Sequence, residues 1–217
     1  MDHAAAYTRV RERIESLVSE PVAETEIPTC PGWTVKDMIA HLADFFEVAT
    51  YGPKGGFSED WGERGVAKRA GLSLEDCLDE WRRRTDEGAA VFESPLAGVA
   101  VADVLSHEQD IRTAIGRPGG TDDENIGPAV MMALSFLGKK AEAASLPTLR
   151  VVTDDIDHTI GDGEPAATLH TSTFDLFRVL HGRRTVQQIE EMKWDGRPGA
   201  WTENIFIFGP TEEKVEG

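Results

Sequence analysis

Hydrophobic residues recur at helical spacing through the first two thirds of the chain. The helices predicted in this way cover residues 4–19, 34–51, 73–92, 99–115 and 126–145. The side chains expected to face a core are Val10, Ile14, Leu17, Val18, Met38, Leu42, Phe45, Phe46, Ala49, Leu74, Cys77, Leu78, Trp81, Val104, Leu105, Ile111 and Ile115. Four or five antiparallel helices with short connections predict a bundle.

The second predicted helix has clear start and stop signals. Thr34 can cap its first turn, with Asp37 three residues later as a variant of the capping box, and Gly52 followed by Pro53 ends it. A glycine-rich segment over residues 52–65 follows. It lacks the GK[ST] sequence and the preceding strand of a phosphate-binding loop, so we expect a surface connection there.

The pattern changes after Pro147. Residues 148–153 and 166–170 are β-like, and the segment between them is rich in turn residues, which predicts a hairpin loop. Residues 172–184 and 185–192 are helical in character, and the apolar "NIFIFG" near the end of the chain predicts a final strand.

This change predicts two domains. Residues 1–147 are expected to form the helical bundle and residues 148–217 a small α+β domain, so the fold class is mainly α. A chain of 217 residues is long enough to bury a sizeable core in this arrangement.

Charge and composition narrow the class of partner. The formal net charge is -17, which disfavours binding to nucleic acid, and the basic run "WRRRT" at 81–85 fits a solvated helix face. No apolar run reaches the ~18 residues of a membrane span, and the charged N-terminus lacks the apolar region of a signal peptide. Two cysteines outside any metal-binding spacing suggest a reducing compartment. We therefore expect a cytoplasmic protein with no membrane partner.

One histidine of the second helix has candidate partners on the fourth. His41 lies one turn from apolar neighbours and should face inward, while Asp103, His107 and Asp110 follow one another at i, i+4 and i+7. A carboxylate and imidazoles from facing helices can bind one metal ion in a bundle and leave a position open for water or substrate. On spacing alone, hydrogen-bonded core histidines with a surface Asp103 are the interpretation that we favour, because an aspartate and a histidine four residues apart form a weak pattern.

Two segments resemble a known family. "PTCPGWTVKDMIAHL" and "HEQDIRTAIGRPG" are similar to the two signatures of the mycothiol-dependent maleylpyruvate isomerase family, within the DinB/YfiT-like superfamily. "TSTFDLFRVLHGRRT" and the following "WDG" resemble the small C-terminal domain of many members. The resemblance implies a four-helix bundle that holds a divalent metal ion, usually zinc.

The resemblance also implies a ligand set. The family's ligands fall on His41, Asp103 and His107, although the family's acidic ligand is typically glutamate and Asp103 is one methylene shorter. Either the helix lies closer to the metal or Asp103 acts through water. Asp110 would then hold the tautomer of an imidazole or pair with Arg112.

Two other residue types carry candidate chemistry. Cys30 could supply a thiolate nucleophile or ligand, but a small apolar residue in a tight turn is the interpretation that we favour. Arg183 and Arg184 end a helix, where cations suit the dipole. The family's appended domain contributes an arginine to the active site in some members, so Arg183 or Arg184 could bind a substrate carboxylate. The segment 154–158 lacks the residue order of an EF-hand.

The resemblance favours a metal-dependent enzyme that uses mycothiol or a similar thiol, either as an S-transferase or as an isomerase. The expected substrate is a small electrophile, and the catalytic candidates outside the metal ligands are Arg183 and Asp110. A homodimer is one option for its assembly. The alternative function is a non-catalytic, metal-binding or regulatory protein on the same scaffold.

Overall fold

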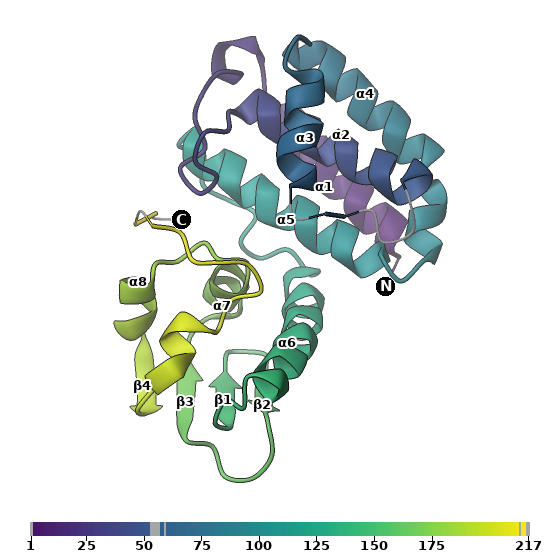
Figure 1. Ribbon diagram of the computed structural model, residues 1–217. Helices are drawn as coiled ribbons and strands as arrows, with labels where there is room; N and C mark the ends of the chain where they lie inside the picture. Colours follow the sequence, from purple (N-terminus) through teal and green to yellow (C-terminus); the bar gives the residue numbers. More distant parts are fainter. Residues whose placement is uncertain (1, 53–56, 59, 213, 216–217) are drawn as a thin grey trace. The chain divides into compact units, whose positions relative to one another are not determined.

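The computed structural model describes residues 2–52, 57–58, 60–212 and 214–215. The chain divides into two compact units, with the division after Gly119. Each unit is described by itself below, with the helices and strands labelled as in Figure 1.

The N-terminal unit is mainly helical where it is described, with one isolated β-bridge between Glu26 and Thr34. Helix α2 packs against α3 and α4, and α5 packs against α1 (Figure 1). Its helices are α1 (His3–Leu17), η1 (Glu20–Val22), α2 (Val35–Tyr51), α3 (Trp61–Arg69), α4 (Leu74–Glu87), η2 (Ala89–Glu93) and α5 (Ala97–Ala114). The predicted helices in this part of the chain are therefore confirmed, apart from shifts of a few residues at their ends.

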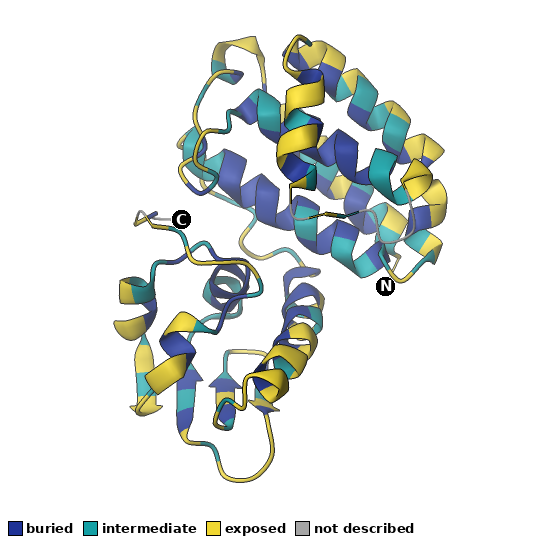
Figure 2. Ribbon diagram, in the orientation of Figure 1, coloured by how far each residue is buried: buried dark blue, intermediate teal, exposed yellow. Residues whose placement is uncertain are grey.

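Local capping and core packing explain these helices. Thr34 and Asp37 form the predicted capping box of α2, and Ser73 begins α4 with a second one. The apolar faces point inward, as the dark blue stripes of Figure 2 show. The hydroxyl of Tyr7 in α1 accepts a 2.8 Å hydrogen bond from the indole N–H of Trp81 in α4. The core is therefore stabilised by polar as well as apolar contacts.

Helix α3 was not expected. The glycine-rich segment 52–65 was predicted to be a surface connection, but residues 61–65 are helical and Gly62 and Gly65 are buried. Residues 53–56 and 59 of that segment lie outside the described residues. The prediction failed because the buried face of α3 is formed by glycines and one arginine, so no apolar stripe marks it in the sequence.

The C-terminal unit combines a four-stranded sheet with helices. The strand order is β2-β1-β3-β4, with β1 and β3 parallel and the other two pairs antiparallel. Helices α6 and α7 pack against each other. The elements are α6 (Ile126–Ala143), β1 (Leu149–Val152), β2 (Asp157–Ile160), β3 (Ala167–His170), α7 (Thr173–Leu180), α8 (Val186–Glu190), β4 (Lys193–Gly196) and η3 (Gly199–Glu203).

Two predictions for this unit were wrong. The turn-rich segment after β1 contains strand β2, because the chain turns back within residues 153–156 and pairs antiparallel with β1. The apolar "NIFIFG" is not a strand: Ile205 and Phe206 are buried by packing, and the N–H of Ile207 donates to the carbonyl of Leu180. The last strand is β4, which contains the "WDG" sequence and pairs with β3.

The division between the units differs from the expected domain boundary near residue 147. Helix α6 contacts α7 and β2, and it is grouped with the sheet rather than with the bundle. Its helical pattern matched that of the bundle helices, and periodicity does not identify the partner of an apolar face.

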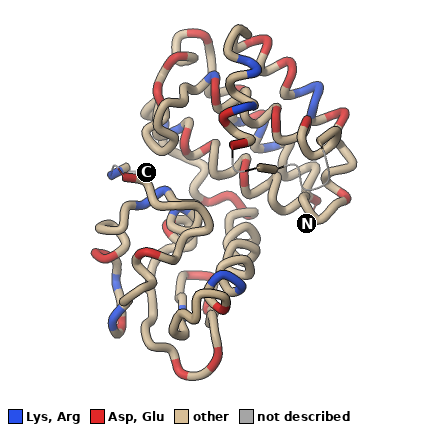
Figure 3. The backbone as a smooth tube through the Cα atoms, in the orientation of Figure 1, with Lys and Arg blue, Asp and Glu red and all other residues tan. Residues whose placement is uncertain are grey.

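Charge is spread over both units. Acidic side chains occur on most elements rather than in one segment (Figure 3). The basic run on α4 is paired with carboxylates: Arg82 contacts Glu15, and Arg83 contacts Glu87 at 3.0 Å. Among the described residues, no helix is long and apolar enough to cross a membrane.

Candidate metal centre

Helices α2 and α5 bring His41, Asp103 and His107 together. One oxygen of Asp103 lies 3.3 Å from Nε2 of His107 and 3.9 Å from Nε2 of His41. The two imidazole centroids are 4.9 Å apart and the rings are nearly perpendicular, at 86°. One donor atom from each residue lies within 4.8 Å of the other two. The sequence-predicted residues therefore converge on one point.

Burial and charge set the protonation of this cluster. Burial opposes ionisation of Asp103, but the imidazoles of His107 and His41 outweigh it and hold the pKa of that carboxyl well below its usual range. Burial also disfavours the charged form of His107, yet the carboxylates of Asp103 and Asp110 raise its pKa. Burial lowers the pKa of His41, and Asp103 offsets that only in part.

Asp110 lies behind His107 and holds its ring. Its carboxylate is fully buried, and one oxygen is 3.0 Å from Nδ1 of His107. Nδ1 is thus engaged by a carboxylate, while Nε2 faces Asp103. Arg112, which was considered as a partner for Asp110, donates to Glu108 at 3.0 Å instead. A carboxylate that orients a metal-binding imidazole is a frequent feature of metal sites.

Aromatic rings enclose His41. The centroid of Trp61 lies 4.5 Å from that of His41, and the centroid of Trp33 lies 5.0 Å from it. Only 6% of His41 is exposed, and its Nδ1 has no hydrogen-bond partner among the described residues. Trp33 lies in the turn just before α2. The contribution of Trp61 was not predicted, because its helix was not.

Cys30 lies closer to the cluster than the sequence suggested. Its sulfur is within 4.8 Å of donor atoms of His107 and Asp110, and its side chain is half-buried. The expected tight turn is present, because the N–H of Cys30 donates to the carbonyl of Ile27 and its own carbonyl accepts from Trp33. Both interpretations of Cys30 are therefore compatible with its position.

The donor set fits a divalent transition metal. Two imidazoles and one carboxylate are the ligands that zinc accepts in open sites, and the carboxylate balances part of the charge of the ion. The fit rests on the convergence of donor atoms and on the ionised carboxylate between two imidazoles.

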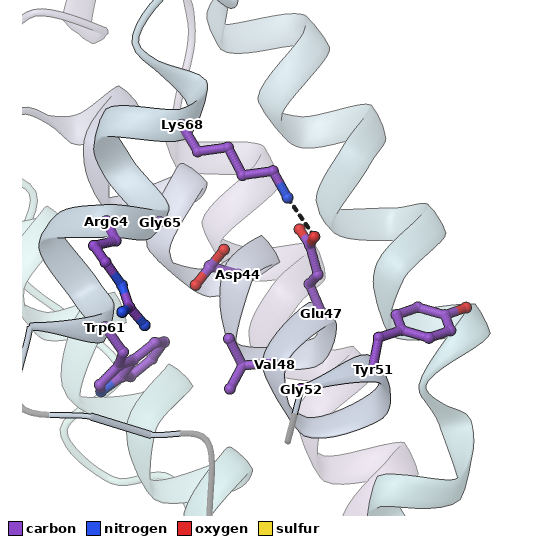
Figure 4. Close-up of a pocket in the computed structure, with 9 residues that line it drawn as sticks. All are labelled: Asp44, Glu47, Val48, Tyr51, Gly52, Trp61, Arg64, Gly65 and Lys68. Carbon is purple, nitrogen blue, oxygen red and sulfur yellow. Dashed lines mark hydrogen bonds and ion pairs between the residues drawn. The ribbon is translucent and has the colours of Figure 1, made fainter.

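A pocket of about 260 Å³ lies between α2 and α3. Figure 4 shows Trp61, Arg64 and Lys68 of α3 facing Asp44 and Glu47 of α2 across it. Lys68 donates to Glu47. Trp61 lines this pocket and also packs on His41, whereas His41, Asp103 and His107 are not among the residues that line it.

Arg183 and Arg184 lie in the C-terminal unit, just after α7. Arg184 is buried and donates to Asp175 at 2.8 Å, as expected of a structural ion pair. Arg183 is half-buried and donates to the carbonyl of His181. A role for either arginine at the cluster stays a prediction.

A helical bundle with a two-histidine, one-carboxylate cluster, followed by a small α+β unit, defines the DinB-like class of fold. Residues 3–104, within the N-terminal unit, match the family described as the mycothiol maleylpyruvate isomerase N-terminal domain. The resemblance inferred from the sequence motifs is confirmed.

Two solved structures share the fold. One is a mycothiol-dependent maleylpyruvate isomerase, with a TM-score of 0.54, and the other is a histidine-to-alanine mutant of such an enzyme, with a TM-score of 0.59. Each is 15% identical to this chain, and the alignment covers 83% of this chain and 87% of the other. No curated protein sequence matches the chain. These similarities confirm the predicted fold class.

Proposed function

We propose that this protein is a metal-dependent enzyme of thiol chemistry, an S-transferase or an isomerase that uses mycothiol or a similar thiol. The observation that carries the proposal is the convergence of His41, Asp103 and His107 within 4.8 Å in a domain of this family. Three protein donors leave at least one coordination position for an external ligand, which is typical of catalytic rather than structural zinc sites.

Each residue has a defined part in this proposal. His41, Asp103 and His107 hold the ion, and Asp110 keeps the proton of His107 on Nδ1 so that Nε2 is free to bind metal. A bound divalent ion, zinc being the best match to these donors, supplies a Lewis acid that lowers the pKa of a coordinated thiol. The indole rings around His41 keep bulk water away from that side of the site.

The substrate would be a small electrophile. Arg183 is proposed to bind an anionic group of it, because a guanidinium binds a carboxylate through two parallel hydrogen bonds. Addition of the thiol to such a molecule leads either to a stable transfer product or to reversible cis–trans isomerisation.

One observation favours a second candidate function. The sulfur of Cys30 lies within 4.8 Å of donor atoms of His107 and Asp110, and a shift of this sulfur onto the ion would fill a fourth position and make a closed structural centre. The protein would then be a non-catalytic metal-binding protein on the same scaffold.

Cobalt substitution separates the two functions. We expect the cobalt-loaded protein to develop a sulfur-to-metal charge-transfer band when a cysteine-based low-molecular-weight thiol is added, since thiolate is a soft, strongly donating ligand. Cys30→Ser should show the same band on thiol addition. Cys77 is fully buried and its pKa is raised by burial, so it is a silent internal control.

The opposite results would reject the enzyme. A band that is present without added thiol and vanishes in Cys30→Ser would place Cys30 on the metal and support the closed centre. Absence of any band, with cobalt bound, would show that the site does not accept a thiol.

A further inference from the structure

The two histidines of the cluster are held in different ways. The second ring nitrogen of a metal-binding histidine usually donates an N–H hydrogen bond to a carboxylate, a carbonyl or water, and this bond fixes the ring. His107 follows this rule through Asp110 at 3.0 Å. His41 does not, because its Nε2 faces Asp103 whereas its Nδ1 is buried without a hydrogen-bond partner in the described part of the chain.

Ring packing takes the place of that hydrogen bond. The His41 imidazole lies between two indoles, at 4.5 Å from Trp61 with an interplanar angle of 35° and at 5.0 Å from Trp33 with an angle of 53°. Trp33 belongs to the turn before α2, and Trp61 is the first residue of α3. Two aromatic faces restrict rotation of the imidazole about its χ angles without any polar contact.

Helix α3 can supply Trp61 only because it lies very close to α2. A Cβ at Gly62 would stand 3.1 Å from the ring of Trp33 and 3.4 Å from Nδ1 of His41. A Cβ at Gly65 would stand 2.5 Å from Asp44. Glycine at both positions therefore permits the approach that brings the indole of Trp61 against His41.

The far end of α3 is fixed by buried charge. Arg69 is almost fully buried and donates to Asp44 and Glu47 of α2, each at 2.6 Å, and to Glu80 of α4 at 3.1 Å. Charge-assisted hydrogen bonds of this kind have strict geometry. The helix is thus held at its first residue by aromatic packing and at its last by an ion-pair network.

We infer that helix α3 is a positioning element for His41 and that Trp61 is its central residue. The inference rests on the proposed function, because it assigns to Trp61 the task of presenting Nε2 of His41 to the metal. Trp61 acts through His41 and is a positioning residue. Its aromatic face, rather than its bulk, is the property that matters.

Three variants isolate that property. Trp61→Phe keeps an aromatic face, Trp61→Leu keeps an apolar side chain without one, and Phe57→Leu is the matched control. Phe57 packs on Trp61 at 4.9 Å and on Phe45 at 5.3 Å, in the same aromatic cluster as the rings on His41. Trp61→Met supplies a second side chain without a ring should Trp61→Leu fail to fold.

Two readouts are measured on each variant. The first is the zinc affinity, from competition with a chromogenic chelator, together with the ligand-field spectrum of the cobalt form. We expect Trp61→Leu to bind zinc about tenfold more weakly, with an altered cobalt spectrum, and Trp61→Phe and Phe57→Leu to stay near the parent protein. The second is the NMR relaxation of the His41 ring in metal-free protein, which should show a mobile ring only in Trp61→Leu.

The outcomes distinguish this inference from the proposed function. Parent affinity and a rigid His41 ring in Trp61→Leu would overturn the inference, as would an equal loss in Phe57→Leu, which would indicate general packing. If the parent protein binds no zinc, the proposed function fails, and the ring relaxation of metal-free His41 alone decides whether Trp61 positions it.

Discussion

At the scale of single residues, Asp103 dominates the electrostatics of the cluster. It is a carboxylate between two buried imidazoles, 3.3 Å from one and 3.9 Å from the other. Its side chain is 23% exposed, and a carboxylate that is partly removed from water costs free energy unless it is paired. Here its partners are two imidazoles, a common kind of metal ligand. This pairing supports the proposal that His41, Asp103 and His107 hold a cation.

Replacing the ligands one at a time should reveal this arrangement. We expect about one divalent ion per chain in the parent protein and a severe loss of metal in His41→Ala and in His107→Ala. Asp103→Ala should weaken binding less, because two imidazoles remain. Elemental analysis of purified variants measures the content. Full occupancy in both histidine variants would show that the metal, if any, lies elsewhere.

Residues that contact each other across helices were only partly predictable. His41, Asp103 and His107 could be found because their helices have clear apolar stripes and their motifs resemble a family. Trp61 could not, since nothing in the sequence says that a tryptophan in a glycine-rich segment packs on a histidine of the preceding helix. For Cys30, the turn was predicted but its distance from His107 depends on tertiary packing.

At the scale of elements, the close contact of α3 with α2 depends on Gly65. In Gly65→Ala the new Cβ would lie 2.5 Å from the Asp44 carboxyl carbon, so the helix or the buried carboxylate must shift. Overpacking of this kind costs about 1–3 kcal/mol. We expect a lower midpoint in urea, whereas Gly71→Ala, whose Cβ would meet nothing within 4 Å, should unfold close to the parent. Equal midpoints for the two variants would contradict the tight contact.

The Arg69 network should make this contact sensitive to acid. Burial opposes ionisation of Glu47 and Glu80, but it is outweighed by hydrogen bonds from Lys68 and Arg69 to Glu47 and from Arg69 and Arg84 to Glu80. These bonds lower the pKa of both carboxyls below their ordinary value of 4.5. A carboxyl whose pKa is lower in the folded protein than in the unfolded chain stabilises the fold at pH values above its ordinary pKa. That stability is lost as the pH falls through the lowered pKa.

Arg69→Met tests the network directly. At neutral pH it should be less stable than the parent by about 3 kcal/mol, because the buried carboxylate of Asp44 and the half-buried carboxylates of Glu47 and Glu80 lose the Arg69 guanidinium. Between about pH 6 and pH 3 its stability should fall less steeply than that of the parent, since the pKa values of Glu47 and Glu80 move back toward 4.5. Urea titrations at several pH values measure both effects. Parallel pH profiles would show that Arg69 does not set these pKa values.

At the scale of the whole molecule, the metal-ligand candidates and Arg183 lie in different units. His41, Asp103 and His107 belong to residues 1–119, and Arg183 belongs to residues 120–216. The two-part organisation was predictable from the change in pattern along the chain. The point of division was not, because α6 has the periodicity of a bundle helix yet packs against α7.

A fragment of residues 1–119 should therefore retain metal binding and lose turnover. Its helices bury their apolar faces against one another, so we expect cooperative unfolding and a zinc affinity near that of the full chain. Loss of zinc binding in the 1–119 fragment, with its helical content intact, would show that the C-terminal unit supplies a ligand.

A fragment of residues 1–147 carries α6 without α7 and should bind a hydrophobic dye, since the α6 face made of Ile126, Val130, Leu134 and Leu137 loses its cover.

In the full chain, Arg183→Gln should raise the KM for an anionic substrate and leave zinc affinity unchanged.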